Sequence, residues 1–414
     1  MAIEETQLAG IRKLLAAVQG SNPFQQAKLQ DTGSGVPSLK DFFANCPFTT
    51  KDELCADQAA HPPNGTNLTF PPEDYTRFCR TSGTTGQSLT WLDRPEDWQW
   101  MLANWEVVFR EAGCTSADRA IFPFSFGPFL GFWAAFEAAQ NLGMLAIPAG
   151  GMGSVQRLEL LLGQQATVLC ATPTYAIRLA EAAAENGIDL SQSPIRKILV
   201  AGEPGGSIPE IRQKILSLWP GAQVFDHHGM TEVGPVTYQT PDEPDLLHVI
   251  ETAYLAEVLD PETDKPVDEG DSGELILTTL GRIGSPLLRY RTGDLVKPVQ
   301  TPRGLALQGG ILGRIDDMAI IRGVNLHPAA VDATLRKIQG IAEYQVYIDS
   351  AHSTLPEIRI DIEPAPGASS GLVQVASEAL RSQFLLRIPV KAVPEGSLPR
   401  YELKARRWNK STKS

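Results

Sequence analysis

The chain has 414 residues, a formal net charge of −12 and 43% hydrophobic residues. This length predicts two or three domains, and this composition is typical of a folded globular protein. The acidic balance disfavours nucleic acid or an anionic membrane surface as a partner. The five cysteines include no Cys-x-x-Cys pair, which argues against a disulfide framework and favours a reducing, cytoplasmic setting.

The two regions that could engage a membrane lack the required pattern. Residues 1–10 have no apolar core, so we expect no signal peptide. The most apolar region, residues 121–136, is interrupted by Pro and Gly and is too short to span a bilayer.

The first part of the chain is predicted to be helical. Apolar residues at helical spacing predict a helix over residues 4–18. Thr50 followed by Glu53 has the capping-box pattern that opens a short helix. Residues 96–112 form an aromatic-rich helical pattern, which we expect to pack in a core.

From residue 118 onward, short apolar runs alternate with helical patterns. We expect strands at 120–124, 144–148, 167–171, 197–201 and 223–225, and helices at 132–142, 156–162, 173–186 and 209–218. Strands that alternate with helices of about 10–15 residues are typical of βαβ units and a mostly parallel sheet. Ligands of such sheets bind at the carboxyl ends of the strands, so the loops there are the expected site.

The rest of the chain has a different pattern. Short strands at 256–259, 273–279 and 305–307 predict a β-rich, antiparallel or barrel-like subdomain. From Asp316 onward, strands at 318–322, 344–348 and 357–362 and helices at 328–338 and 372–386 predict a small α+β module. We therefore predict an α/β fold with two domains, residues 1–315 and 316–414. Residues 408–414 are expected to form a polar tail.

The stretch Arg80-Thr81-Ser82-Gly83-Thr84-Thr85-Gly86-Gln87-Ser88 combines five hydroxyl side chains with two glycines. Glycines let the backbone close around a ligand, and successive N–H groups with hydroxyls can bind an anion such as a polyphosphate. The stretch is not a Walker A loop, because no Gly-Lys-Ser/Thr closes it. Taken alone, it also fits an ordinary surface turn.

Further stretches follow it in a fixed order. They are Ala201-Gly202-Glu203-Pro204-Gly205, Asp226-His227-His228-Gly229-Met230-Thr231-Glu232, Arg289-Tyr290-Arg291-Thr292-Gly293-Asp294, Gly313-Arg314-Ile315-Asp316, Arg322-Gly323-Val324-Asn325 and Leu398-Pro399-Arg400-Tyr401-Glu402-Leu403-Lys404. In this order and at these intervals, the combination resembles the acyl-adenylate-forming (AMP-binding) enzymes, and within them the phenylacetate–coenzyme A ligase family. The resemblance covers nearly the whole chain.

The resemblance implies a site for ATP. The residues that match the phosphate cradle are Ser82, Gly83, Thr84, Thr85 and Gly86, and Thr81 precedes them in the same nucleotide-binding stretch. The residues that match the walls of the adenine slot are Gly202, Glu203, Pro204 and His228. Asp294 is suited to accept hydrogen bonds from the ribose hydroxyls. The other residues in the nucleotide-binding stretches are Asp226, Gly229, Met230 and Arg314.

The resemblance also implies the residues of catalysis. Attack of a carboxylate on the α-phosphate joins two anions, so the site must supply positive charge. Lys404 resembles the near-terminal lysine that bridges both groups, although a lone Lys is ordinarily a solvated surface residue. Thr231 matches a phosphate-contacting hydroxyl, and Glu232 matches the acid that holds Mg²⁺ with the phosphates.

Thioester formation requires that the lysine leave and a thiol enter. The resemblance implies that the small C-terminal domain is mobile and swings about an acidic hinge at Asp316. The face that then admits coenzyme A is expected to include Arg322, Gly323 and Asn325. The Asp316-Asp317 pair also fits an ordinary turn before a strand.

The acyl pocket is expected between residues 122–133 and the Gly229-Met230 turn, with Phe124 and Phe126 as walls. An aromatic, apolar slot suits an aryl or arylacetic acid. The other aromatic residues of this segment are expected to be core residues. The sequence leaves the particular acid open, and it also leaves a homodimer open.

Two other functions remain open at this point. One is an adenylating enzyme that passes its acyl group to a carrier protein or an amine. The other is a nucleotide-binding protein that no longer catalyses, because Gln87 and Leu403 stand where the family has Lys and Gly. His228 stands where the family usually has Tyr against adenine, and an imidazole can still stack there. A zinc site at His227, His228 and His248 is disfavoured, because their spacing fits no known ligand set.

Overall fold

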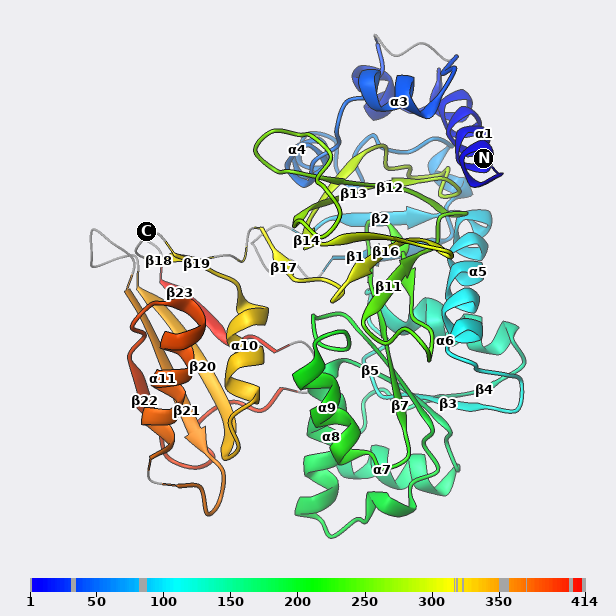
Figure 1. Cartoon of the computed structure of the whole chain (residues 1–414). Coiled ribbons are helices and arrows are strands. Elements are labelled where there is room, and N and C mark those ends of the chain that lie inside the picture. Colours follow the sequence, from blue (N-terminus) through cyan, green and yellow to red (C-terminus); the bar gives the residue numbers. More distant parts are fainter. Residues whose placement is uncertain are drawn as a thin grey trace.

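The structure, a computed structural model, describes residues 2–30, 35–81, 88–315, 317, 319–321, 324–349, 357–369, 371–401 and 405–411. Ala2, Ile320 and Asn325 are described by their backbone alone. Figure 1 shows a large N-terminal body and, beside it, a smaller C-terminal body coloured mainly orange and red. Across the described residues, no helix is long and apolar enough to cross a membrane.

A parallel sheet of five strands forms the centre of the N-terminal body. Its strands lie in the order β4 (Leu145–Pro148), β3 (Arg119–Phe122), β5 (Val168–Ala171), β6 (Lys197–Ala201) and β7 (Gln223–His227). The connecting helices are α6 (Gly131–Asn141), α7 (Ser154–Gly163), α8 (Pro173–Glu185) and α9 (Pro209–Leu218). The predicted parallel βαβ arrangement is confirmed, because every strand pair in this sheet is parallel.

Alternate residues of these strands pack on opposite faces of the sheet. In β5, Val168 and Cys170 belong to the core that includes α6 and α5 (Pro95–Glu111). Leu169 and Ala171 belong to the core formed with α7, α8 and α9. Because helices cover both faces, all residues of β5 are buried, and the strand is an unbroken apolar run.

The β-rich subdomain consists of two antiparallel four-stranded sheets, as predicted. The strands of the first are β10 (Thr237–Tyr238), β11 (Leu246–Val249), β16 (Gly304–Gln308) and β15 (Pro298–Thr301). The strands of the second are β12 (Tyr254–Leu259), β13 (Gly273–Thr279), β14 (Tyr290–Val296) and β17 (Gly313–Arg314).

Short helices at the N-terminus cover this subdomain. They are α1 (Ala2–Val18), α2 (Pro23–Lys28), α3 (Leu39–Asn45) and α4 (Lys51–Ala60). Ile11 and Leu14 of α1 share a core cluster with Leu255 and Leu280. The predicted capping box is present, because Thr50 and Glu53 bond to each other's backbone N–H.

The C-terminal body has its own core and its own sheet. Its four-stranded sheet has the order β22 (Val390–Ala392), β21 (Glu357–Pro364), β20 (Ile341–Asp349) and β23 (Trp408–Ser411). The helices α10 (Pro328–Arg336) and α11 (Leu372–Phe384) and the hairpin of β18 (Ala319–Ile321) and β19 (Val324–Leu326) contribute to the same core. A separate α+β domain at this end of the chain was predicted and is found.

One expectation for this domain is wrong. Residues 408–411 are a strand that pairs in parallel with β20, whereas a polar tail was expected. Only Trp408 packs against the domain core, and the remaining side chains of β23 are polar and exposed. The strand is held by backbone pairing at a sheet edge, which composition does not reveal.

Candidate active site

Loops at the carboxyl ends of β5, β6 and β7 meet at one edge of the parallel sheet, as expected for this fold. Glu203, in the loop after β6, accepts a hydrogen bond from the backbone N–H of Thr174 at 2.8 Å. Asp226, near the end of β7, accepts one from the N–H of Ser207 at 2.7 Å. Burial raises the pKa of Asp226, whose carboxylate also accepts from the N–H of His227 at 3.0 Å. These two acids therefore hold neighbouring loops in place.

His228 and Asp294 lie next to each other in a buried position. His228 Nε2 is 3.2 Å from Asp294 Oδ2, and each side chain is about 6% exposed. Arg314 lies opposite Asp294 in the β14–β17 pair, and its guanidinium is 3.2 Å from Asp294 Oδ1. The residues predicted for the adenine wall and the ribose are thus brought together, although they are far apart in sequence.

Thr231 and Glu232 lie in the tight turn between β8 (Gly229–Met230) and β9 (Gly234–Pro235). One guanidinium nitrogen of Arg282 donates to the carbonyl oxygens of both residues, at 2.8 and 2.7 Å. The same guanidinium makes two hydrogen bonds to Asp93, at 2.6 and 2.8 Å, and both side chains are fully buried. Burial alone would lower the pKa of Arg282, but the neighbouring Asp93 carboxylate raises it above its usual value.

Sequence reasoning missed Arg282. Its signal was a lone basic residue in the largely apolar stretch 280–288, and its partner Asp93 lies 189 positions away. Nothing in either local pattern points to the other.

The Glu232 carboxylate is the notable acid in this turn. Glu232 is only 5% exposed, and no described residue hydrogen-bonds its carboxylate oxygens. Carboxylate oxygens are the ligands that Mg²⁺ takes from proteins, together with phosphate oxygens, so the position is suited to a divalent metal ion.

The phosphate-loop prediction falls largely outside the described residues. Ser82, Gly83, Thr84, Thr85 and Gly86 are not described, but both ends of the loop are. They continue from the antiparallel hairpin of β1 (Arg77–Arg80) and β2 (Thr90–Asp93), which the sequence reading did not predict. The backbone N–H and the hydroxyl of Thr81 pair with Leu89 at 2.9 Å each and close the base of the loop.

Most residues assigned to the C-terminal domain also lie outside the described part of the chain. These are Asp316, Arg322, Gly323 and Lys404, together with the side chain of Asn325. Their neighbours are described. Ala405, the residue after Lys404, donates its backbone N–H to Glu203 Oε2 at 3.0 Å. Lys410 donates to the carbonyl oxygen of Asp317, which follows Asp316, at 3.2 Å.

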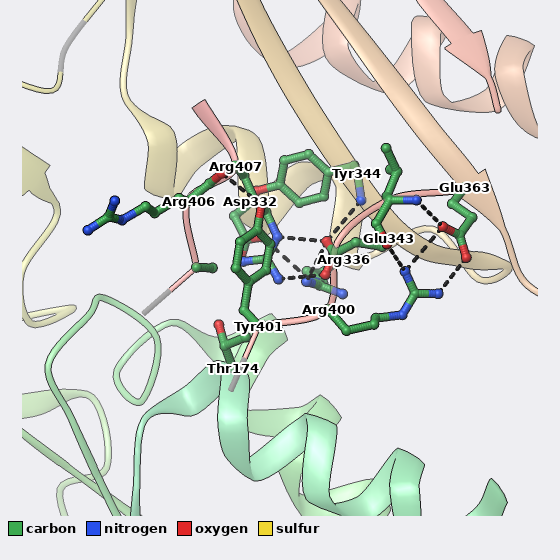
Figure 2. A network of polar contacts seen from close by, with 12 residues as sticks. Thr174, Asp332, Arg336, Glu343, Tyr344, Glu363, Arg400, Tyr401, Arg406 and Arg407 are labelled. Carbon is green, nitrogen blue, oxygen red and sulfur yellow. Dashed lines mark hydrogen bonds and ion pairs between the residues drawn. The ribbon is translucent and has the colours of Figure 1, made fainter. Parts of the chain in front are cut away.

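Two arginine–glutamate pairs hold the chain on both sides of residues 402–404, as Figure 2 shows. Before residues 402–404, Arg400 pairs with Glu363, which also accepts hydrogen bonds from the N–H groups of Gly396 and Leu398. Burial alone would raise the pKa of Glu363, but these hydrogen bonds lower it to about 2. After residues 402–404, Arg407 donates two hydrogen bonds to Glu343, at 2.7 and 3.0 Å.

Aromatic rings gather after β3, where the acyl pocket was predicted. Phe124 and Phe126 are half-buried, and their ring centroids are 4.3 Å apart. Phe132 of α6 is buried and contacts Phe124, with ring centroids 5.6 Å apart. Partly exposed rings over a buried one are what a pocket wall requires, and the assignment of Phe124 and Phe126 to the acyl pocket stays a prediction.

Comparisons with known proteins agree with these observations. A family model described as AMP-binding enzyme matches residues 17–281, and one described as AMP-binding enzyme C-terminal domain matches residues 323–410. A phenylacetate–coenzyme A ligase of Thermus thermophilus is 30% identical over 374 residues, which is 87% of this chain and 81% of that protein. One of Escherichia coli is 28% identical over 374 residues, with 87% and 83% covered.

Among solved structures, a 2-hydroxyisobutyryl-CoA ligase in its postadenylation state has a TM-score of 0.92 at 27% identity, with 99% of this chain and 89% of that chain covered. The same ligase in its thioesterification state has a TM-score of 0.73 at 28% identity, with 98% and 89% covered. The covered share of the chain is nearly equal in the two comparisons, so the difference in TM-score reflects how the chain is arranged in space. The arrangement in this structure is more similar to that of the postadenylation state. The chain belongs to the AMP-binding enzyme family and is a phenylacetate–coenzyme A ligase-like member of it.

Proposed function

We propose that this chain uses ATP to convert a carboxylic acid into an acyl-adenylate and pyrophosphate, and then transfers the acyl group to coenzyme A. The observation that carries the proposal is the buried contact between His228, which follows the carboxyl end of β7, and Asp294 of β14 in a chain of this family. Relatives named as phenylacetate–coenzyme A ligases support the choice of acceptor.

In the first half-reaction, His228 and the Gly202-Glu203-Pro204 loop form the walls of the adenine slot. Asp294 accepts hydrogen bonds from the ribose. Since His228 and Arg314 both lie within 3.2 Å of Asp294, ribose hydroxyls must share this carboxylate with two neighbours. The loop 82–86 and Thr231 supply donors to the phosphates. Lys404 supplies the positive charge between the carboxylate and the α-phosphate, where negative charge grows.

Magnesium is part of the proposal. Glu232 would hold Mg²⁺, because its carboxylate makes no hydrogen bond to a described residue and the residue is only 5% exposed. The ion would supply charge neutralisation for the triphosphate, and the buried Arg282–Asp93 pair would keep the turn that carries Glu232 in position.

In the second half-reaction, the C-terminal domain would rotate about Asp316. The boundary between the two domains would then lie between residues 315 and 316. Arg322 and Gly323 lie between β18 and β19 in sequence, and Asn325 lies within β19, so one hairpin would present all three to coenzyme A. Domain rotation of this kind commonly limits turnover.

The acid is proposed to be an aryl or arylacetic acid. The half-buried Phe124 and Phe126 and the names of the relatives support this choice. The test is a panel of acids assayed with ATP and Mg²⁺ for pyrophosphate release, and with coenzyme A for thioester formation by mass spectrometry. We expect both products with arylacetic acids. A chain that releases no pyrophosphate with any acid is not an adenylating enzyme, and pyrophosphate without a thioester would indicate a carrier protein or an amine as acceptor.

A further inference from the structure

His227, which the proposed reaction does not use, points away from the nucleotide residues. It is the last residue of β7, and side chains of a strand alternate between its two faces. His228 lies against Asp294, whereas the His227 ring lies against Trp105 of α5, with centroids 4.2 Å apart. His227 is 5% exposed. The two neighbouring histidines therefore serve different surroundings.

The protonation of His227 follows from its hydrogen bond. Nδ1 lies 2.6 Å from the backbone carbonyl oxygen of Thr237, and a carbonyl oxygen can only accept. Nδ1 therefore carries the proton. Burial lowers the pKa of His227 to about 4, so at neutral pH the ring is uncharged and Nε2 is a lone-pair acceptor.

Nε2 lies beside the turn that bounds the predicted acyl pocket. A Cβ added at Gly229 would stand 3.1 Å from it, so a glycine at this position leaves that side of the nitrogen uncovered. In the described part of the chain, no residue hydrogen-bonds Nε2. A ligand that donates a hydrogen bond could therefore pair with Nε2, and a site that receives such a donor discriminates against analogues that lack it.

Ring contacts connect His227 to the predicted pocket wall. Trp105 contacts Phe132 at a centroid distance of 6.0 Å, and Phe132 contacts Phe124 at 5.6 Å. Nε2 is thus a polar acceptor at the edge of an aromatic cluster. Such a site suits an apolar acid that carries one neutral donor, because burying an additional ammonium among aromatic rings would be far more costly.

We infer that His227 Nε2 accepts a hydrogen bond from the acyl substrate, and that the preferred substrate is a hydroxy-substituted acid. This inference rests on the proposed function. The hydroxyl would replace a water molecule at Nε2, while the carboxyl end of the acid faces the α-phosphate. His227 would then be a specificity-determining residue, and removing it should change the choice between acids more than the rate with any one of them.

The test uses matched acid pairs that differ by one hydroxyl group. These are phenylacetic acid against its 2-, 3- and 4-hydroxy forms, and isobutyric acid against 2-hydroxyisobutyric acid. For each pair, kcat/KM for pyrophosphate release is measured in the wild type, in His227→Phe, which keeps a ring against Trp105, and in His227→Gln, whose amide oxygen can accept in place of Nε2.

We expect at least one hydroxy acid to be preferred over its parent by about 10- to 100-fold in the wild type. The ratio of kcat/KM for the hydroxy acid to kcat/KM for its parent should fall to about one in His227→Phe. It should rise again in part in His227→Gln. Because the ratio is taken within one variant, loss of folded protein cancels. Turnover of parent acids without any hydroxy preference, or a preference that survives in His227→Phe, would overturn this inference alone. If no acid releases pyrophosphate, the proposed function and this inference fall together.

Discussion

The carboxylate of Glu203 joins the two domains, because one oxygen accepts from the N–H of Thr174 at 2.8 Å and the other from the N–H of Ala405 at 3.0 Å. Ala405 directly follows Lys404 in the sequence. A residue predicted as part of the adenine wall therefore also fixes the backbone next to the proposed catalytic lysine.

Replacing Glu203 by Gln should slow adenylation. Gln keeps one acceptor oxygen but loses the charge and the second acceptor, which removes a charge-assisted bond worth about 1.5–3 kcal/mol. We expect pyrophosphate release to fall roughly 10- to 100-fold, while thioester formation from supplied acyl-adenylate is largely retained. Equal losses in both steps would contradict a role in docking the lysine.

Glu210 provides the matched control for this experiment. Its carboxylate lies 2.8 Å from Lys337 and also links the two domains, but the lysine side chain is 60% exposed. Exposed ion pairs contribute roughly 0–1 kcal/mol. Glu210→Gln should therefore change either half-reaction by no more than a few-fold.

Replacing Lys404 by Ala should abolish adenylate formation. The ammonium is proposed to act only while the carboxylate attacks the α-phosphate, so thioester formation from supplied acyl-adenylate should be nearly unchanged. The two steps are measured by pyrophosphate release and by acyl–coenzyme A formation. A parallel decline in both would show that Lys404 has a different role.

Replacing Arg282 by Met should destabilise the protein strongly. It leaves Asp93 buried and uncompensated, and breaking a buried pair in this way costs about 3–5 kcal/mol. The double variant Arg282→Met with Asp93→Asn should recover part of that loss in urea unfolding. If Arg282 also positions Glu232, the double variant should keep a raised KM for ATP. A double variant with an unchanged KM would limit the pair to a structural role.

Stability should fall with acidification below about pH 6.5, partly because of His227. Burial lowers its pKa to about 4 in the folded protein, from 6.5 ordinarily. Between these pH values the unfolded chain binds a proton that the folded chain excludes, so stability present above pH 6.5 is lost as the pH falls toward 4. The loss amounts to about 3 kcal/mol. His227→Phe should flatten the slope of unfolding free energy against pH over this interval, and an unchanged slope would contradict it.

The sequence predicted those parts of the fold that local periodicity specifies. The strands of the parallel sheet were predicted because short apolar runs alternate with helical patterns, and β5 is an entirely buried run. Strand β23 was missed because its side chains are mostly polar and exposed, and its place depends on pairing with β20. The hairpin of β1 and β2 was missed because polar residues begin and end both strands, so neither is an apolar run.

The candidate site also contains residues that local motifs identify and contacts that only the fold creates. His228 and Asp294 could be assigned from motifs, and their contact follows from the fold. The bond between Glu203 and Ala405 and the Arg282–Asp93 pair join residues 202 and 189 positions apart. Long-range polar partners of this kind leave no local pattern, so only the folded structure identifies them.

The anchoring of the chain on both sides of residues 402–404 has a consequence for timing. The span from Tyr401 to Ala405 reaches at most about 14 Å when fully extended. The Arg400–Glu363 and Arg407–Glu343 pairs hold the residues on both sides of this span to the C-terminal domain. If Lys404 acts at the nucleotide as proposed, it would withdraw over a longer distance only when the whole C-terminal domain departs. One rigid-body rotation would thus both end the first reaction and clear the way for the second.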